Sequence, residues 1–77
     1  MKIPRDIDSD KLIKAVSLYG YKVSRQTGSH IRVTNQDGSH SITVPHHSPI
    51  KVGTLNNIVK DFCTVNKINA FDFYKML

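Results

Sequence analysis

The first part of the chain carries apolar residues at helical spacing. Leu12, Ile13, Val16 and Tyr19 fall on one face of a helix. The residues just before this pattern are acidic or polar, and acidic side chains are favoured at the positively polarised N-terminus of a helix: Asp6, Asp8, Ser9 and Asp10. The pattern therefore predicts a first helix, which we expect Gly20 to close as its C-terminal cap.

From Tyr21 onward the spacing of apolar residues changes from helical to alternating. Three short stretches place an apolar residue at every second position, with polar residues between them: Tyr21 and Val23, Ile31 and Val33, and Ile42 and Val44. Alternation of this kind is typical of strands that bury one face and expose the other. The middle of the chain is therefore predicted to form three strands.

The strands can be aligned because paired residues of an antiparallel ladder face the same way. Pairing Val23 with Ile31, and Tyr21 with Val33, leaves residues 26–28 as a loop of three residues that ends in Gly28. Pairing Val33 with Ile42, and Ile31 with Val44, leaves residues 36–39 as a turn of four residues. Both connections have common hairpin lengths, so an antiparallel meander is expected.

The last third of the chain returns to helical spacing. An apolar stripe follows Thr54, the expected N-cap of a second helix, and consists of Leu55, Ile58, Val59 and Phe62. The segment from Asn69 to Leu77 has Phe71, Tyr74 and Leu77 at intervals of three and predicts a short third helix.

This order of elements predicts an α+β fold in which a three-stranded antiparallel sheet carries both main helices on one face. If the alternating apolar residues face the helices, the opposite face of the sheet is polar and partly cationic. It would then consist of Lys22, Ser24, His30, Arg32, Thr34, Ser41 and Thr43.

Composition limits the classes of function. A chain of 77 residues has room for one domain, with a core over about residues 9–66, and its net charge of +5 favours a polyanionic partner such as nucleic acid. Cys63 is the only cysteine, which excludes an internal disulfide and a cysteine-rich zinc module. No signal peptide or membrane-spanning stretch is recognisable, so a cytoplasmic location is expected.

His30 is the strongest candidate for chemistry, since the strand pattern places it on the polar face beside Arg32. Histidine can give or take a proton near neutral pH, and RNA supplies its own nucleophile in the 2′-hydroxyl. A small ribonuclease therefore needs little more than a proton-transfer group and cations near the scissile phosphate. Lys22, Arg25 and Arg32 are candidates for those cations. The competing interpretation is a solvated surface histidine without a catalytic role.

The remaining candidates have simpler interpretations as well. Gly28 allows a phosphate to approach the backbone, but the turn alone accounts for a glycine. His40, His46 and His47 lack the carboxylate or cysteine ligands that would favour a metal site. Lys51 precedes a helix N-terminus, which favours phosphate, or else is simply solvated. Cys63 lies beside the apolar stripe, so we assign it no chemistry.

Three motifs resemble those of the HicA (YcfA-like) toxins of bacterial toxin-antitoxin modules. They are "RQTGSHIRV", "ITVPHH" and "KVGTLNNIVK", and the resemblance covers about residues 9–66. It implies a fold like the double-stranded-RNA-binding domain, and an mRNA interferase that is held inactive by a HicB-type antitoxin. The histidine of the family's Gly-Ser-His motif is the catalytic one, which corresponds to His30.

We therefore expect a metal-independent endoribonuclease that needs no cofactor, with His30 as its catalytic residue. The residues expected to contact RNA are Lys22, Arg25, Gly28, Ser29, Arg32, His46, His47 and Lys51. A second acid or base is left open among His46, His47 and Lys22. Two alternatives remain: a module that binds double-stranded RNA without cleaving it, and a polar face whose only role is to dock an acidic partner.

Overall fold

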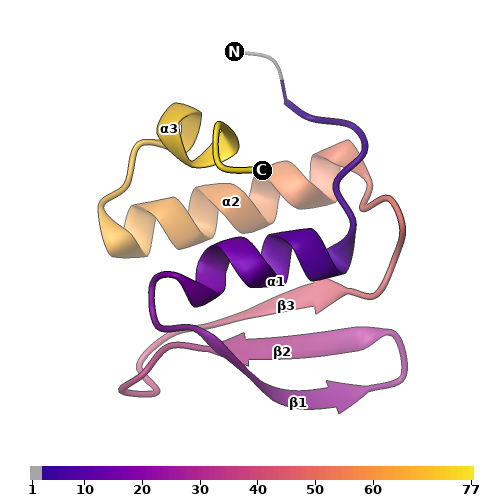
Figure 1. Ribbon diagram of the computed structural model, residues 1–77. Coiled ribbons are helices and arrows are strands. Elements are labelled where there is room, and N and C mark those ends of the chain that lie inside the picture. The colour runs from indigo at the N-terminus through magenta and orange to yellow at the C-terminus, as the bar shows by residue number, and fades with distance from the viewer. Residues whose placement is uncertain (1–2) are drawn as a thin grey trace.

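The computed structural model describes residues 3–77 and confirms the α+β fold with a three-stranded antiparallel sheet (Figure 1). The domain boundary expected at residue 1 lies outside the described residues. In chain order the elements are α1 (Ser9–Ser17), β1 (Lys22–Thr27), β2 (His30–Thr34), β3 (Ser41–Pro45), α2 (Val52–Asn66) and α3 (Ala70–Tyr74). The strands lie side by side in the order β1-β2-β3, and the helices are stacked on one side of the sheet.

The core lies between the sheet and the helices. Strands β2 and β3 contribute the alternating residues Ile31, Val33, Ile42 and Val44, each of which is at most 5% exposed. The helices and connections cover them with Ile7, Leu12, Ala15, Val16, Tyr21, Ile50, Leu55, Val59, Phe62, Cys63, Phe73 and Tyr74. Burial of one such aliphatic or aromatic side chain stabilises the fold by about 1.5–3 kcal/mol, so this pattern determines which face of the sheet points inward.

The second hairpin has the register expected from the sequence. Val33 pairs with Ile42, and Ile31 pairs with Val44. The amide of Asn35 donates to the carbonyl of His40 at 3.0 Å, which closes the turn of four residues between them.

The first hairpin differs from the sequence-based register. Val23 pairs with Val33 rather than with Ile31, and the register shifts between Val23 and Arg25. Thr27 pairs with His30, so the connection is a turn of two residues with Gly28 at φ +58°. Glycine in the first central position is the residue that one of the tight hairpin turns requires. The alignment failed because period two cannot reveal an inserted bulge residue.

The outer strand β1 is exposed along its whole length, from Lys22 to Thr27. Val23, which was expected in the core, is 50% exposed although its partner Val33 is fully buried. Both β1 and β3 are edge strands, but the helices cover the inner side of β3 and leave β1 half exposed at Val23.

Two helix-terminus predictions and one predicted buried face need correction. Helix α1 begins at an Asp8 N-cap, as the acidic residues suggested, but it ends at Ser17, and Gly20 lies two residues beyond the C-cap Leu18. Helix α2 begins at Val52 with Lys51 as N-cap, so the expected cap at Thr54 is wrong. The expected third helix is present as Ala70–Tyr74, but Phe73 is its fully buried aromatic residue, whereas Phe71 is 49% exposed.

A chain of hydrogen bonds joins α2 to the sheet at the end where β2 and β3 are connected by the turn. The Asn66 amide donates to the Tyr21 hydroxyl at 3.0 Å, and that hydroxyl lies 2.7 Å from Nδ1 of His40. His40 Nε2 lies 3.0 Å from the Asp61 carboxylate. A neutral His40 ring protonated on Nε2 satisfies both contacts, with the Tyr21 hydroxyl donating to Nδ1 and Nε2 donating to Asp61; a doubly protonated ring would donate to both partners.

No helix within residues 3–77 has the length and apolar character needed to cross a lipid bilayer.

Removal of the Tyr21 hydroxyl tests whether this chain of hydrogen bonds stabilises the fold. Tyr21 is fully buried, so Tyr21→Phe leaves the ring packing intact and deprives the largely covered His40 ring of its partner. We expect the free energy of unfolding in urea to fall by about 1–3 kcal/mol. Tyr19→Phe is the matched control, because the Tyr19 hydroxyl makes only a 3.5 Å contact with the Met76 sulfur. Equal stability of the two variants would show that the network contributes nothing.

Candidate nucleic-acid interface

The face of the sheet that points away from the helices is called the open face below. Its side chains form three rows across the strands, as the pairing in both ladders requires. The rows are Thr27, His30 and Pro45; then Arg25, Arg32 and Thr43; then Lys22, Thr34 and Ser41, with Ser24 beside the third row.

His30 is the first residue of β2 and is exposed. It follows the Gly28-Ser29 turn directly, and its neighbours across the strands are Thr27 and Pro45. Within residues 3–77 no hydrogen bond involves its imidazole ring. The sequence pattern placed it opposite Ser24, whereas the bulge in β1 puts Thr27 there. The side chain is nevertheless directed outward, with both ring nitrogens available to a ligand.

The loop after β3 returns to the turn beside His30. The amide of His46 donates to the carbonyl of Ser29 at 2.6 Å, and the carbonyl of His47 accepts from the amide of Ser9 at 3.3 Å. Both histidines are exposed. The loop is thus held between the first hairpin and the start of α1, with His46 next to the turn that precedes His30.

The N-terminus of α2 lies at the same end of the sheet. Lys51, the N-cap, makes no side-chain capping bond, and its carbonyl accepts from the Leu55 amide at 2.8 Å. Since the Leu55 amide makes the first intrahelical bond, the three amides before it have no partner within the helix. Such free amides at a helix N-terminus favour an anion. The amide of Ile50 donates to the carbonyl of Ile7 at 2.7 Å and so ties this helix start to the segment before α1.

The structure thus brings most of the predicted residues together at one end and leaves one apart. Gly28, Ser29, His30, His46, His47 and Lys51 belong to the turn, loop and helix start at the end of the sheet where β2 begins. Lys22 pairs with Thr34 at the opposite end of β2. Thr34 lies four positions after His30, a distance of about 13 Å along a strand. Lys22 is therefore poorly placed to share a reaction centre with His30.

Arg25 and Arg32 form the row next to His30. They are paired across β1 and β2, and both are exposed. The sequence analysis named both as candidate cations and placed Arg32 on the open face, whereas strict alternation from Val23 would turn Arg25 to the helix side. The bulge at Ser24 is the feature that sequence reasoning missed, and nothing in the spacing of apolar residues signals it.

The cations of the open face lack acidic partners. Within residues 3–77 the one contact at ion-pair distance joins His40 and Asp61, and it lies at the end of the sheet where the turn connects β2 and β3. The Asp37 carboxylate is engaged locally, since the hydroxyl and amide of Ser39 both donate to it, and these bonds hold its pKa below the usual value. The open face therefore presents uncompensated positive charge, which attracts a polyanion.

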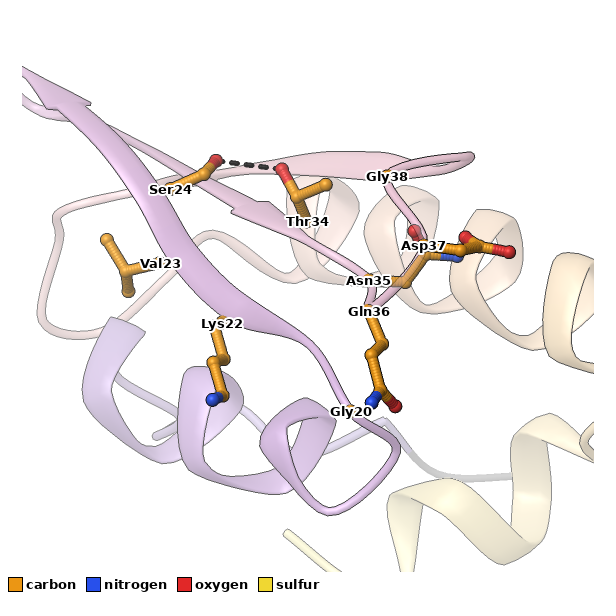
Figure 2. A pocket seen from close by; sticks show the side chains of 9 residues that line it. All are labelled: Gly20, Lys22, Val23, Ser24, Thr34, Asn35, Gln36, Asp37 and Gly38. Atoms are coloured by element: carbon orange, nitrogen blue, oxygen red, sulfur yellow. Dashed lines mark hydrogen bonds between the residues drawn. The ribbon is translucent and has the colours of Figure 1, made fainter.

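A shallow hollow of about 620 Å³ lies at the far end of the open face, between the start of β1 and the turn after β2 (Figure 2). Lys22, Ser24, Thr34 and Gln36 are among the residues that line it, and His30 is not. This hollow is thus separate from the candidate catalytic residue, which stands on an exposed surface.

The residues described offer no arrangement for a metal ion. No group of three or more histidine, cysteine or acidic side chains converges within residues 3–77. His40, which the sequence analysis weighed with His46 and His47 as a metal site, is hydrogen-bonded to Tyr21 and Asp61 instead. Cys63 is buried, and burial raises the pKa of its thiol, which disfavours the reactive thiolate.

Comparison with known proteins identifies the family. No curated protein and no solved structure matches the chain significantly. The family described as the HicA toxin of bacterial toxin-antitoxin matches residues 9–62. The match begins with the first residue of α1, ends within α2, and includes the whole sheet with His30 and the loop of His46 and His47. The chain therefore belongs to the HicA toxin family.

Proposed function

We propose that this HicA-family toxin is a metal-independent endoribonuclease that cleaves mRNA and thereby inhibits translation, with His30 as its catalytic acid or base. The observation that carries the proposal is the placement of the His30 imidazole. It is exposed on the open face, free of protein hydrogen bonds among the residues described, and one row from Arg25 and Arg32.

The chemistry follows from what RNA provides. The ribose 2′-oxygen attacks the adjacent phosphorus, its proton passes to a base, and the bond from phosphorus to the 5′-oxygen breaks. The departing 5′-oxygen takes up a proton from an acid or from water. The products are a 2′,3′-cyclic phosphate and a 5′-hydroxyl end, and no metal or cofactor is needed.

His30 can serve this reaction at either proton-transfer step. The nearby candidate for the complementary step is His46, because its backbone is bonded to Ser29, the residue before His30. His47 belongs to the same loop but is also tied to α1 through Ser9. The cations of the open face would hold the RNA backbone against the sheet through their attraction for its phosphates.

The RNA contacts proposed from the sequence fall into two groups. Gly28, Ser29, His46, His47 and Lys51 belong to the turn, loop and helix start at the end of the sheet where β2 begins, and Arg25 and Arg32 form the row next to His30. Lys22 would contact RNA only beyond that row, at the far end of the face.

The toxin-antitoxin family also implies a protein partner. We propose that a HicB-type antitoxin inhibits the enzyme by covering the open face, where the uncompensated arginines favour acidic side chains. The same surface would then bind RNA and antitoxin in competition.

Substitution of His30 tests its proposed catalytic role. Purified protein is expected to cleave single-stranded RNA in the presence of EDTA, and His30→Ala is expected to lower the rate about 100 to 10,000-fold, the usual contribution of a positioned acid or base. Far-ultraviolet circular dichroism should show the same fold, because the His30 side chain is exposed. Thr27→Ala, a change at the residue paired with His30, is the matched control for local disturbance and should retain much more activity.

Two outcomes would contradict this mechanism. Full activity of His30→Ala would remove His30 from the reaction. Equal cleavage of a substrate with a single 2′-deoxy sugar at the cut would exclude the 2′-hydroxyl as nucleophile. RNA binding without scission by the unmodified protein would instead support the non-catalytic alternative.

Co-expression tests the proposed antitoxin partner. Induction of the unmodified chain in bacterial cells should stop growth, whereas co-expression with the product of the neighbouring antitoxin gene should restore it. The complex should form equally with His30→Ala, since that variant keeps the arginines of the open face. Growth arrest that persists with an antitoxin bound to the protein would show that the antitoxin does not act by covering this face.

A further inference from the structure

The bulge in β1 is a small irregularity with a large effect on the open face. Val23 pairs with Val33 and Arg25 pairs with Arg32, so Ser24 is the extra residue between them. The Ser24 hydroxyl lies 3.2 Å from the carbonyl oxygen of Arg32 and 2.7 Å from the Thr34 hydroxyl (Figure 2). The Thr34 hydroxyl lies in turn 2.9 Å from that of Ser41. This row of hydroxyls fixes the bulge in place.

The extra residue changes the direction of Arg25. In a regular strand Val23 and Arg25 would face the same way, because side chains alternate with period two. Val23 pairs with the buried Val33, so a regular strand would direct Arg25 toward the helix side. Insertion of Ser24 reverses this parity and places Arg25 on the open face opposite Arg32. Bulges commonly re-aim a side chain in this way beside functional sites.

The resulting pair is electrostatically unfavourable in the free protein. Directly paired residues have Cβ atoms about 4.5–5.5 Å apart, and like charges at this separation destabilise a sheet. Within residues 3–77 neither guanidinium has a carboxylate within ion-pair distance; the one contact at that distance joins His40 and Asp61. An anion bound between the two arginines would remove the repulsion and gain charge-assisted hydrogen bonds from both.

We propose that the bulge at Ser24 builds a two-arginine clamp, Arg25 with Arg32, that binds the backbone phosphate next to the scissile one. This inference rests on the proposed nuclease function and deepens it. Arg32 is two residues from His30 along β2, a step of about 6.6 Å, and this step allows one phosphate at His30 and its neighbour at the clamp. The substrate is thereby a strand with at least two consecutive phosphates.

A double-mutant cycle in the His30→Ala background tests the clamp without any cleavage. Without phosphate, Arg25→Gln and Arg32→Gln should each raise the midpoint of thermal unfolding by about 1–5 °C, and the double variant should gain less than the sum. Lys60→Gln, which removes one exposed charge from α2, is the matched control and should show no such gain. Inorganic phosphate, added at constant ionic strength, should stabilise the parent more than either arginine variant. Independent effects of the two substitutions, or equal stabilisation of all variants by phosphate, would overturn the clamp.

A second measurement places the clamp relative to the cut. In the active protein, Arg25→Gln should reduce kcat/KM for a trinucleotide, which has two phosphates, at least ten times more than for a dinucleotide, which has one. Equal losses on both substrates would mean that Arg25 acts at the scissile phosphate, and the proposal would be wrong. If the unmodified protein cleaves neither these substrates nor longer single-stranded RNA, the nuclease proposal fails, whereas the thermal cycle still decides whether the arginines bind phosphate.

Discussion

Alternation in β2 is the constraint on which the rest of the structure depends. Ile31 and Val33 are buried beneath the helices, and residues 30, 32 and 34 must therefore point to the other side of the sheet. A slip of one residue would expose both aliphatic side chains and turn Arg32 inward, at a cost of several kcal/mol for the lost burial alone. Packing of the core is thus what directs His30 and Arg32 into solvent.

The fold was predictable wherever burial on one side imposes a pattern. The second hairpin has the expected register because both of its strands bury alternate residues. The first hairpin does not, since β1 is exposed throughout and its apolar Val23 carries no information about the inserted Ser24. The buried Phe73 was missed for a related reason, because a helix of five residues is too short for spacing to distinguish its inner face.

The candidate site shows the same division. The outward direction of His30 follows from the sequence, but the proximity of His46 depends on a backbone hydrogen bond to Ser29 that no residue pattern encodes. The pairing of Arg25 with Arg32 depends on the bulge, and the role of His40 depends on contacts with Tyr21 and Asp61 from distant segments. The sequence therefore predicts which residues face outward better than it predicts which residues lie beside them.

One end of the sheet stabilises the fold, and the other carries the candidate reaction site. At the end where β2 and β3 are joined by the turn, Tyr21, His40, Asp61 and Asn66 fix α2 against the strands. At the other end an exposed imidazole follows the Gly28-Ser29 turn, to which the histidine loop is hydrogen-bonded, and it does not line the hollow at the far end of the sheet. Such a site supplies few groups of its own, and it relies on the 2′-hydroxyl and the phosphates of the substrate to complete the reaction centre.

The most direct test of the central claim is to map bound RNA on the protein by nuclear magnetic resonance. An oligonucleotide made resistant to cleavage by 2′-O-methylation should change the amide shifts of residues 28–32 most strongly, together with those of Arg25 and His46 and the side-chain signals of Arg32. Changes confined to the outer surfaces of α1 and α2, with the open face unaffected, would contradict the account.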